Sequence, residues 1–251
     1  WISGFPFTYY FLHFFVCYAI GMFCTWRLCK DGLVKIPTRV AMQMYWGIMP
    51  AIVIGARLGE AILFVPQYYW SQPGRLLEVW NGGFAFQGAT ALTVVFLWFY
   101  AKVRKLDAFH LNDIVVTGVP GAIFVGRIAN FINAECVGKV TDVSWAVVFP
   151  KHGMMPRHPT QLYEALVEGE ILFLILWLGR KRLKTPGLQT GVFLVCYGAS
   201  RFIIEFFREQ YPGQLVSAFG LGVSQLVCLL MFGIGVWLLF RSAPRFRLSY
   251  T

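Results

Sequence analysis

Polar and charged side chains interrupt an apolar stretch of the chain at residues 126–135, where Arg127, Asn130, Asn133 and Glu135 follow one another closely. Such groups are costly in hydrocarbon, so an ionisable residue inside an apolar segment is a candidate functional residue. Arg127 and Asn130 are three residues apart and share one face of a helix. The planar guanidinium of Arg127 presents donors that suit a phosphate or a carboxylate. The stretch is therefore a candidate anion-binding site.

A second set of polar residues lies near the end of a later apolar segment. Tyr197, Arg201, Glu205 and Arg208 are spaced by four, four and three residues. A helix would align these side chains in one stripe. Arg201 and Glu205 could form only a salt bridge that locks a bundle, because charges inside a membrane usually pair with one another. The alternative is that the stripe faces the same site as Arg127.

The composition predicts a polytopic membrane protein. The chain has 251 residues, of which 57% are hydrophobic and 14% charged, and its mean hydropathy is +0.60. Soluble domains carry about 25% charged residues. A membrane-spanning helix needs about 20 apolar residues. We expect seven spans in one all-α transmembrane domain over residues 1–251, at about 7–28, 42–65, 79–101, 114–133, 162–179, 188–207 and 218–240. The polar residues 134–160 are expected to form a small extracytoplasmic insertion.

The distribution of basic residues predicts the orientation. With the N-terminus outside and the C-terminus in the cytoplasm, the inner loops hold fourteen of the 22 Lys and Arg, and the outer segments hold five. This asymmetry follows the positive-inside rule. It also accounts for the net charge of +10 as contact with the anionic inner leaflet, so a nucleic acid partner is not expected.

This orientation brings the interrupted segments to one side of the membrane. Arg57 and Glu60 lie late in the second segment, and Gln87 lies early in the third. All three residues therefore approach the outer side of the membrane. The stripe at 197–208 and the stretch at 126–135 approach the same side. We expect one cavity that opens outward. Arginines slightly outnumber glutamates among these residues, and a phospholipid head group would satisfy the surplus. The cysteines and histidines show no metal spacing, so no metal is expected.

Four motifs of the chain resemble those of the prolipoprotein diacylglyceryl transferases. Residues 126–135 resemble the family signature G-R-[LI]-G-N-F-I-N-x-E. Residues 80–88 are similar to W-x-G-G-M-S-F-H-G, residues 157–164 to R-H-P-S-Q-L-Y-E, and residues 197–208 to Y-G-x-x-R-x-x-x-E-F-x-R. The order and spacing of the motifs match over nearly the whole chain.

The resemblance implies an activity in the bacterial cytoplasmic (inner) membrane. The family moves the diacylglyceryl group of phosphatidylglycerol onto the lipobox cysteine of a preprolipoprotein and releases glycerol-1-phosphate, with no cofactor. Arg127 and Arg201 would bind the phosphate and stabilise its developing charge. Arg57 and Arg208 are further candidates for contact with the lipid. The resemblance also implies a set of residues that orient the head group and the arginines, namely Asn130, Asn133, Glu135, Tyr197 and Glu205.

One departure from the family pattern concerns proton transfer. Gln87 stands where the family has a histidine, and glutamine cannot accept a proton at neutral pH. The thiol must ionise before it attacks. Gln87 is a candidate catalytic residue by its position in the motif. The candidates for the base that ionises the thiol are Glu135, Glu205 and His158. An alternative function is that of a catalytically reduced homologue, serving as a lipid-binding subunit of a membrane protein assembly. An anion channel or transporter is disfavoured, because no second charged layer lies on the inner side.

Overall fold

Helices make up most of the chain in the computed structural model, which describes residues 7–34, 36–63, 65–78, 85–181, 185–209 and 221–242. The long helices are α1 (Phe7–Lys30), α2 (Thr38–Leu63), α4 (Phe86–Arg104), α6 (Val119–Ile132), α9 (Leu188–Ile204) and α10 (Val223–Ser242). The shorter ones are α3 (Pro66–Ser71), η1 (Pro73–Leu77), α5 (Ala108–Val116), η3 (Pro150–His152), α7 (Thr160–Glu164), η4 (Ala165–Ile171) and α8 (Leu172–Gly179). The predicted helical fold is confirmed.

Each of the seven predicted segments contains a helix in its described part, but two of them are not single α-helices. The fourth consists of α5 and α6, which are separated at Thr117 and Gly118. Pro120 lies in the first turn of α6, where its missing N–H costs no helical hydrogen bond. The fifth begins as α7, continues as the π-helical η4 and ends as α8. By length and composition, two described stretches could cross a membrane, Ala108–Ile132 and Ser224–Ser242.

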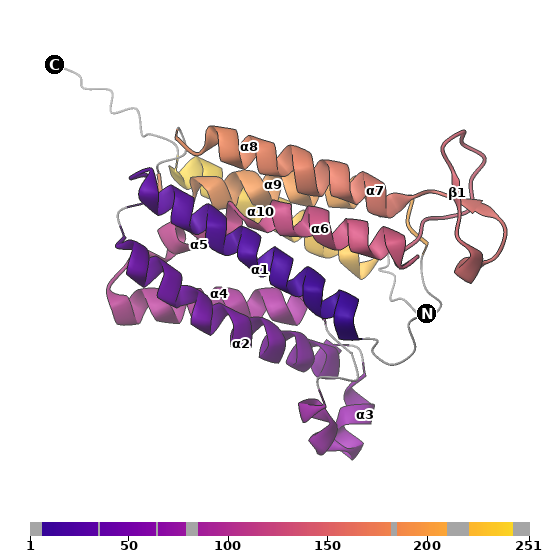
Figure 1. The fold of residues 1–251 in the computed structure, drawn as a ribbon, viewed down its shortest axis with the longest axis horizontal. Helices are drawn as coiled ribbons and strands as arrows, with labels where there is room; N and C mark the ends of the chain where they lie inside the picture. The colour runs from indigo at the N-terminus through magenta and orange to yellow at the C-terminus, as the bar shows by residue number, and fades with distance from the viewer. Residues whose placement is uncertain are drawn as a thin grey trace.

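The helices lie side by side with a small β-hairpin at one end of the bundle (Figure 1). α2 packs against α4, α9 against α10, and α6 against η4, α7 and α1. The hairpin pairs β1 (Val147–Val148) with β2 (Pro156–Arg157) in antiparallel register. We call this end of the bundle the hairpin end. α6 and α9 both finish there and α7 starts there (Figure 1), so their terminal residues are brought close together.

Glycines allow α2 and α4 to approach closely. A Cβ added at Gly88 would lie 2.1 Å from the carbonyl oxygen of Gly55 and 2.6 Å from the Cα of Gly59. Gly55 and Gly59 are four residues apart and lie on one side of α2. This is the small-xxx-small arrangement by which helices pack in membranes. The pair α2–α4 therefore depends on the absence of side chains at these positions.

The polar insertion is tied by backbone hydrogen bonds to the end of α9. Gly138 N–H donates to the carbonyl oxygen of His158 at 3.0 Å, and Lys139 N–H donates to that of Phe207 at 2.8 Å. A Cβ at Gly138 would lie 2.5 Å from the His158 oxygen. Arg157 and Glu209 add an ion pair at 2.8 Å. The insertion is therefore fixed relative to the stripe on α9.

Large apolar side chains are exposed along the helices. Phe15, Trp46, Phe99, Leu178 and Phe240, which lie on different helices, are between 61% and 83% exposed. Apolar surface of this extent would be unfavourable in water and marks contact with a membrane or a partner. Together with the high apolar content of the chain, it supports a membrane protein.

Candidate active site

A fully buried carboxylate at the hairpin end is shared by three arginines. Glu164, the last residue of α7, is 0% exposed. Its Oε2 lies 2.8 Å from Nε of Arg127 on α6. Its Oε1 binds Nη1 of Arg201 on α9, and Nη1 of Arg208 lies 3.5 Å from the same oxygen. One carboxylate thus gathers three guanidinium groups. We call these residues, with Glu168 and Glu205, the arginine–glutamate cluster.

Arg201 lies at the centre of the arginine–glutamate cluster. Its Nη2 is 3.1 Å from Oε2 of Glu205, and its Nη1 is 4.0 Å from Oε1 of Glu168. Arg201 is 9% exposed and Glu205 is 5% exposed. Tyr197, one turn earlier, is also buried and stacks on Phe193 with ring centroids 5.4 Å apart. The stripe on α9 therefore faces the interior of the bundle.

Close packing of α6 on η4 brings Arg127 to Glu164. An added Cβ at Gly169 would lie 2.8 Å from the Cα of Phe124 on α6. The absence of a side chain at Gly169 lets the two helices approach, one turn from Arg127 and near Glu164. η4 is a π-helix, and single π-helical turns occur frequently at functional sites. The π-helical segment carries Glu168 and therefore contributes to the arginine–glutamate cluster.

Glu164 and Glu168 were missed as site residues by the sequence analysis. Both lie in the fifth predicted segment, four residues apart, and a pair of carboxylates in an apolar segment is the signal that could have found them. Their presence corrects the expected surplus of arginines. The cluster holds three arginines (Arg127, Arg201 and Arg208) and three glutamates (Glu164, Glu168 and Glu205). The cluster therefore has no excess of positive charge before a ligand binds. Its attraction for an anion depends on how the charged side chains rearrange when the anion arrives.

A hydrogen-bonded branch leads from the arginine–glutamate cluster to Glu135. Arg127 Nη1 donates to Oδ1 of Asn130 at 3.5 Å, and Asn130 Nδ2 donates to Oε2 of Glu135 at 2.8 Å. The shared helical face predicted for Arg127 and Asn130 is thus present. Asn133 caps the C-terminus of α6. The residues of the stretch at 126–135 are therefore linked to one another and to α7 and α9.

Glu135 lies in a strained turn that other segments hold in place. Its neighbours Ala134 and Cys136 both have φ of 55°, a left-handed conformation that costs energy for residues with a side chain. Four side chains bind consecutive carbonyl oxygens of this turn: Lys151 that of Asn133 (3.0 Å), His152 that of Ala134 (2.9 Å), Gln161 that of Glu135 (2.5 Å) and Thr160 that of Cys136 (2.9 Å). These contacts stabilise a conformation that the local sequence disfavours.

Comparison with known proteins assigns the whole bundle to one family. The family model for prolipoprotein diacylglyceryl transferase matches residues 1–241. The chain belongs to this family. Its relatives include phosphatidylglycerol–prolipoprotein diacylglyceryl transferases of several bacteria. That of Nitratidesulfovibrio vulgaris (strain Miyazaki F) is 38% identical over 231 residues, which cover 90% of this chain and 87% of the relative.

Two further relatives are similar over most of their length. The phosphatidylglycerol–prolipoprotein diacylglyceryl transferase of Ruegeria pomeroyi is 37% identical over 261 aligned residues, covering 90% of this chain and 88% of the relative. That of Pseudoalteromonas atlantica is 41% identical over 201 residues, covering 79% and 71%. The diacylglyceryl transferase resemblance of the four motifs is thereby confirmed, and the chain belongs to a family of membrane enzymes.

Two predicted site residues of this diacylglyceryl transferase homologue lie apart from the arginine–glutamate cluster. Arg57 donates to the carbonyl oxygens of Arg75 (2.7 Å), Leu76 (3.2 Å) and Glu78 (2.9 Å). It therefore holds the segment from η1 to Glu78, and contact of Arg57 with the lipid stays a prediction. The sequence suggested that Arg57 and Arg127 converge, because their segments end on the same side of the membrane. A similar depth in the membrane does not by itself bring two side chains into contact.

Gln87 is exposed in the first turn of α4, and within the described residues it makes no hydrogen bond to the arginine–glutamate cluster. α4 packs on α2 rather than on α6 or α9, which explains the separation. Residues 79–84, which include most of the motif before Gln87, lie outside the described part of the chain. The position of the family's histidine thus carries no side chain in contact with the arginines.

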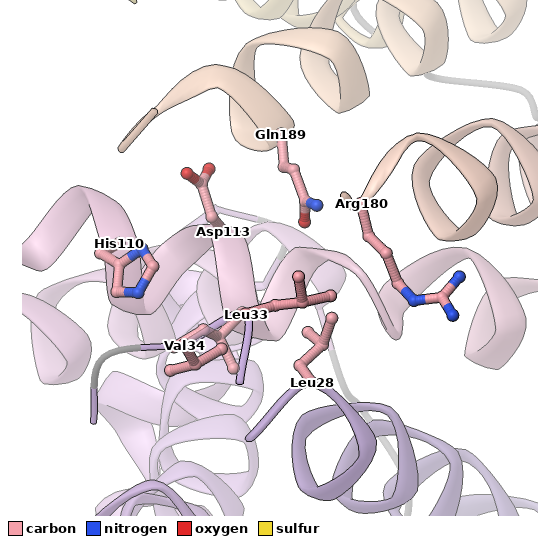
Figure 2. A pocket seen from close by; sticks show the side chains of 8 residues that line it. Leu28, Leu33, Val34, His110, Asp113, Arg180 and Gln189 are labelled. Carbon is pink, nitrogen blue, oxygen red and sulfur yellow. The ribbon is translucent and has the colours of Figure 1, made fainter. Parts of the chain in front are cut away.

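A second polar group lies at the other end of the bundle of this transferase homologue. Asp113 of α5 accepts from Gly187 N–H (2.7 Å), Thr190 N–H (2.8 Å) and Thr190 Oγ1 (2.6 Å). Figure 2 shows Asp113 directed toward the segment that carries Gln189, beside a small cavity that Arg180 also lines. Asp113 satisfies the free amides at the start of α9. This group therefore fixes α9 relative to α5.

Proposed function

We propose that this chain transfers the diacylglyceryl group of phosphatidylglycerol to the lipobox cysteine thiol of bacterial preprolipoproteins. The observation that carries the proposal is the convergence of Arg127 and Arg201, from two helices, at one end of a helical bundle that belongs to this family. The lipid is a substrate, and the reaction needs no metal or cofactor. Its products are the thioether-linked prolipoprotein and glycerol-1-phosphate.

The chemistry suits a pair of arginines. The leaving group is a phosphate monoester, and charge accumulates on its oxygens as the carbon–oxygen bond breaks. Guanidinium groups fixed in a site that excludes water stabilise this charge without having to reorganise. Arg127 and Arg201 bind the two oxygens of one carboxylate in the resting protein. The same two groups can hold two oxygens of a phosphate.

Glu164 positions the arginines before the lipid arrives. Its side chain is 0% exposed, while that of Arg127 is 20% exposed and those of Arg201 and Arg208 are 11% and 15% exposed. Arg127 is therefore the guanidinium through which a phosphate first contacts the arginine–glutamate cluster. As the phosphate binds, Glu164 shares the arginines with it. Asn130 contacts Arg127 and Glu205 contacts Arg201, and these contacts keep the two guanidinium groups aligned.

The proposed function places the hairpin end at the outer face of the bacterial cytoplasmic membrane. Residues 1–251 then form one transmembrane domain with seven spans, and residues 134–160 lie outside as an insertion. The distribution of Lys and Arg supports this orientation by the positive-inside rule. Preprolipoproteins present their lipobox at this face, so the thiol and the lipid phosphate meet at the hairpin end.

A transfer assay with phosphatidylglycerol and a lipobox peptide tests the proposal. The wild-type protein is expected to modify the peptide, and Arg127→Ala or Arg201→Ala to lower the rate by about 10²–10³-fold. Arg104→Ala is the matched control, because Arg104 is exposed at the other end of the bundle and its loss leaves turnover intact. A folded wild-type protein that retains phosphatidylglycerol but gives no transfer would instead support the lipid-binding subunit.

A further inference from the structure

The reaction needs a group that accepts the proton of the cysteine thiol. Gln87, which stands at the position of the family's histidine, has an amide that cannot serve as a base. Glu135, Glu205 and His158 were left open as candidates by the sequence. Each of them lies near the hairpin end, so they can be compared by their access and their surroundings.

Two of the candidates are less suitably placed, because Glu205 is nearly buried and His158 packs within an aromatic group. Glu205 is 5% exposed and lies 3.1 Å from Arg201, so it acts as a partner of that guanidinium. His158 Nδ1 lies 3.1 Å from the hydroxyl oxygen of Tyr163. The imidazole ring also packs edge-on against Phe207, with ring centroids 5.2 Å apart. These contacts fix His158 within an aromatic group.

The two buried glutamates of the fifth segment are also unsuited. Glu164 and Glu168 are both 0% exposed. Glu164 binds three arginines. Glu168 lies behind Arg201 and is covered on all sides. A thiol on a second protein cannot reach either carboxylate, whereas Glu135 is only partly buried and lies past the end of α6.

Glu135 combines access with a fixed position beside the proposed phosphate site. Asn130 bridges its carboxylate to Arg127. The strained turn at Ala134 and Cys136 and the four side chains that bind its carbonyl oxygens hold this carboxylate in place. Strained backbone that is supported by surrounding contacts is a feature of functional sites.

We propose that Glu135 is the catalytic base that takes the proton of the lipobox thiol. This role rests on the proposed function. The carboxylate accepts the thiol proton as the sulfur electron pair forms a bond to the terminal glycerol carbon of the diacylglyceryl group. The bond between that carbon and the phosphate oxygen breaks, and its electron pair leaves with glycerol-1-phosphate, whose charge Arg127 and Arg201 neutralise. The proton on Glu135 is then released to the phosphate product or to water.

The electrostatic surroundings of Glu135 favour this role. Burial raises the pKa of its carboxyl group, and the ammonium of Lys151 lowers that pKa in part. Among the described residues, His152 from η3 binds the turn and Arg127 from α6 is linked to Glu135 through Asn130. A base is most effective when its pKa approaches the operating pH. Because the base must be ionised, transfer is expected above this pKa and is lost as pH falls through it.

The test compares cysteine and selenocysteine lipobox peptides with the wild type and Glu135→Gln. With the cysteine peptide at pH 7, Glu135→Gln is expected to lower the rate by about 10²–10⁴-fold. The selenocysteine peptide restores most of this loss, because a selenol ionises at neutral pH without a base. With cysteine, the variant's rate rises about tenfold per pH unit up to the thiol pKa of about 8.5, while the wild-type rate levels off at lower pH.

Two further variants distinguish a base from a structural role. Glu135→Asp keeps a carboxylate and is expected to retain part of the activity. Glu205→Gln is expected to slow transfer to both peptides equally, since Glu205 acts through Arg201. Retention of phosphatidylglycerol by Glu135→Gln shows that the variant is folded.

Equal losses with both peptides in folded Glu135→Gln, or no loss with either, would overturn the role of Glu135. A wild-type protein that modifies neither peptide would overturn the proposed function itself, and the role of Glu135 with it. Wild-type turnover with a selective selenocysteine rescue supports both proposals.

Discussion

Arg127 and Arg201 are joined through one buried carboxylate, with Nε of Arg127 on Oε2 of Glu164 and Nη1 of Arg201 on Oε1. The two arginines are far apart in sequence and lie on α6 and α9. Their shared partner lies on a third helix, α7. At the hairpin end, this network of charges therefore links α6, α7 and α9. It also places two guanidinium groups side by side. Packing and proposed catalysis depend on the same contacts.

Loss of Glu164 should destabilise the bundle more than loss of any exposed carboxylate. Glu164→Ala leaves three partly buried guanidiniums without their common partner, and removing one member of a buried ion pair costs about 3–5 kcal/mol. Thermal unfolding in detergent measures the effect. Glu170→Ala is the control, because Glu170 is exposed two residues after Glu168, and a change within about 0.5 kcal/mol is expected. Similar unfolding midpoints for the two variants would contradict the central place of Glu164.

Gly88→Ala should disrupt the packing of α2 against α4. The new Cβ would lie 2.1 Å from the Gly55 carbonyl oxygen, and overpacking of this kind costs about 1–3 kcal/mol. The unfolding midpoint is expected to fall. Gly74→Ala serves as the control, because no atom lies within 4 Å of a Cβ at that position and no change is expected. A stable Gly88→Ala protein would show that α2 and α4 can separate without cost.

Asp113 should couple α5 to α9. Asp113→Ala leaves the amides of Gly187 and Thr190 without their acceptor, and a buried donor without a partner costs about 1–3 kcal/mol. Thr190→Val removes the hydroxyl that also binds Asp113. A double-mutant cycle on unfolding free energies is expected to give a coupling of about 0.5–3 kcal/mol between the two changes. Strict additivity would exclude the pairing.

Labelling in intact cells should report the orientation of the bundle. In a background without the native cysteines, Lys139→Cys lies at the hairpin end and Lys102→Cys at the other end, and both positions are exposed. A membrane-impermeant maleimide is expected to label Lys139→Cys only. Permeabilised cells, in which both should react, provide the control. Labelling of Lys102→Cys in intact cells would reverse the proposed orientation.

Local sequence features predicted much of this protein. Hydropathy located all seven helical segments, and helical periodicity placed Tyr197, Arg201 and Glu205 on one buried stripe. The same reasoning overlooked Glu164, because it lies at the start of an apolar segment and its partners belong to other helices. It also grouped Arg57 with the site by its depth in the membrane, whereas the described contacts of Arg57 are with the segment at residues 75–78. Both outcomes have one cause, which is that spacing along a chain does not specify which helices are in contact.

The sequence by itself determined that helices form, where they begin and end to within about seven residues, and which polar groups interrupt them. These properties follow from local propensity and hydropathy, which act over a few turns. Only the tertiary structure decided that Arg127 and Arg201 share Glu164, that Arg57 binds its own loop, and that a strained turn holds Glu135. Ion pairs in a medium of low dielectric depend on distances between helices, and those distances are set by close packing at residues such as Gly169.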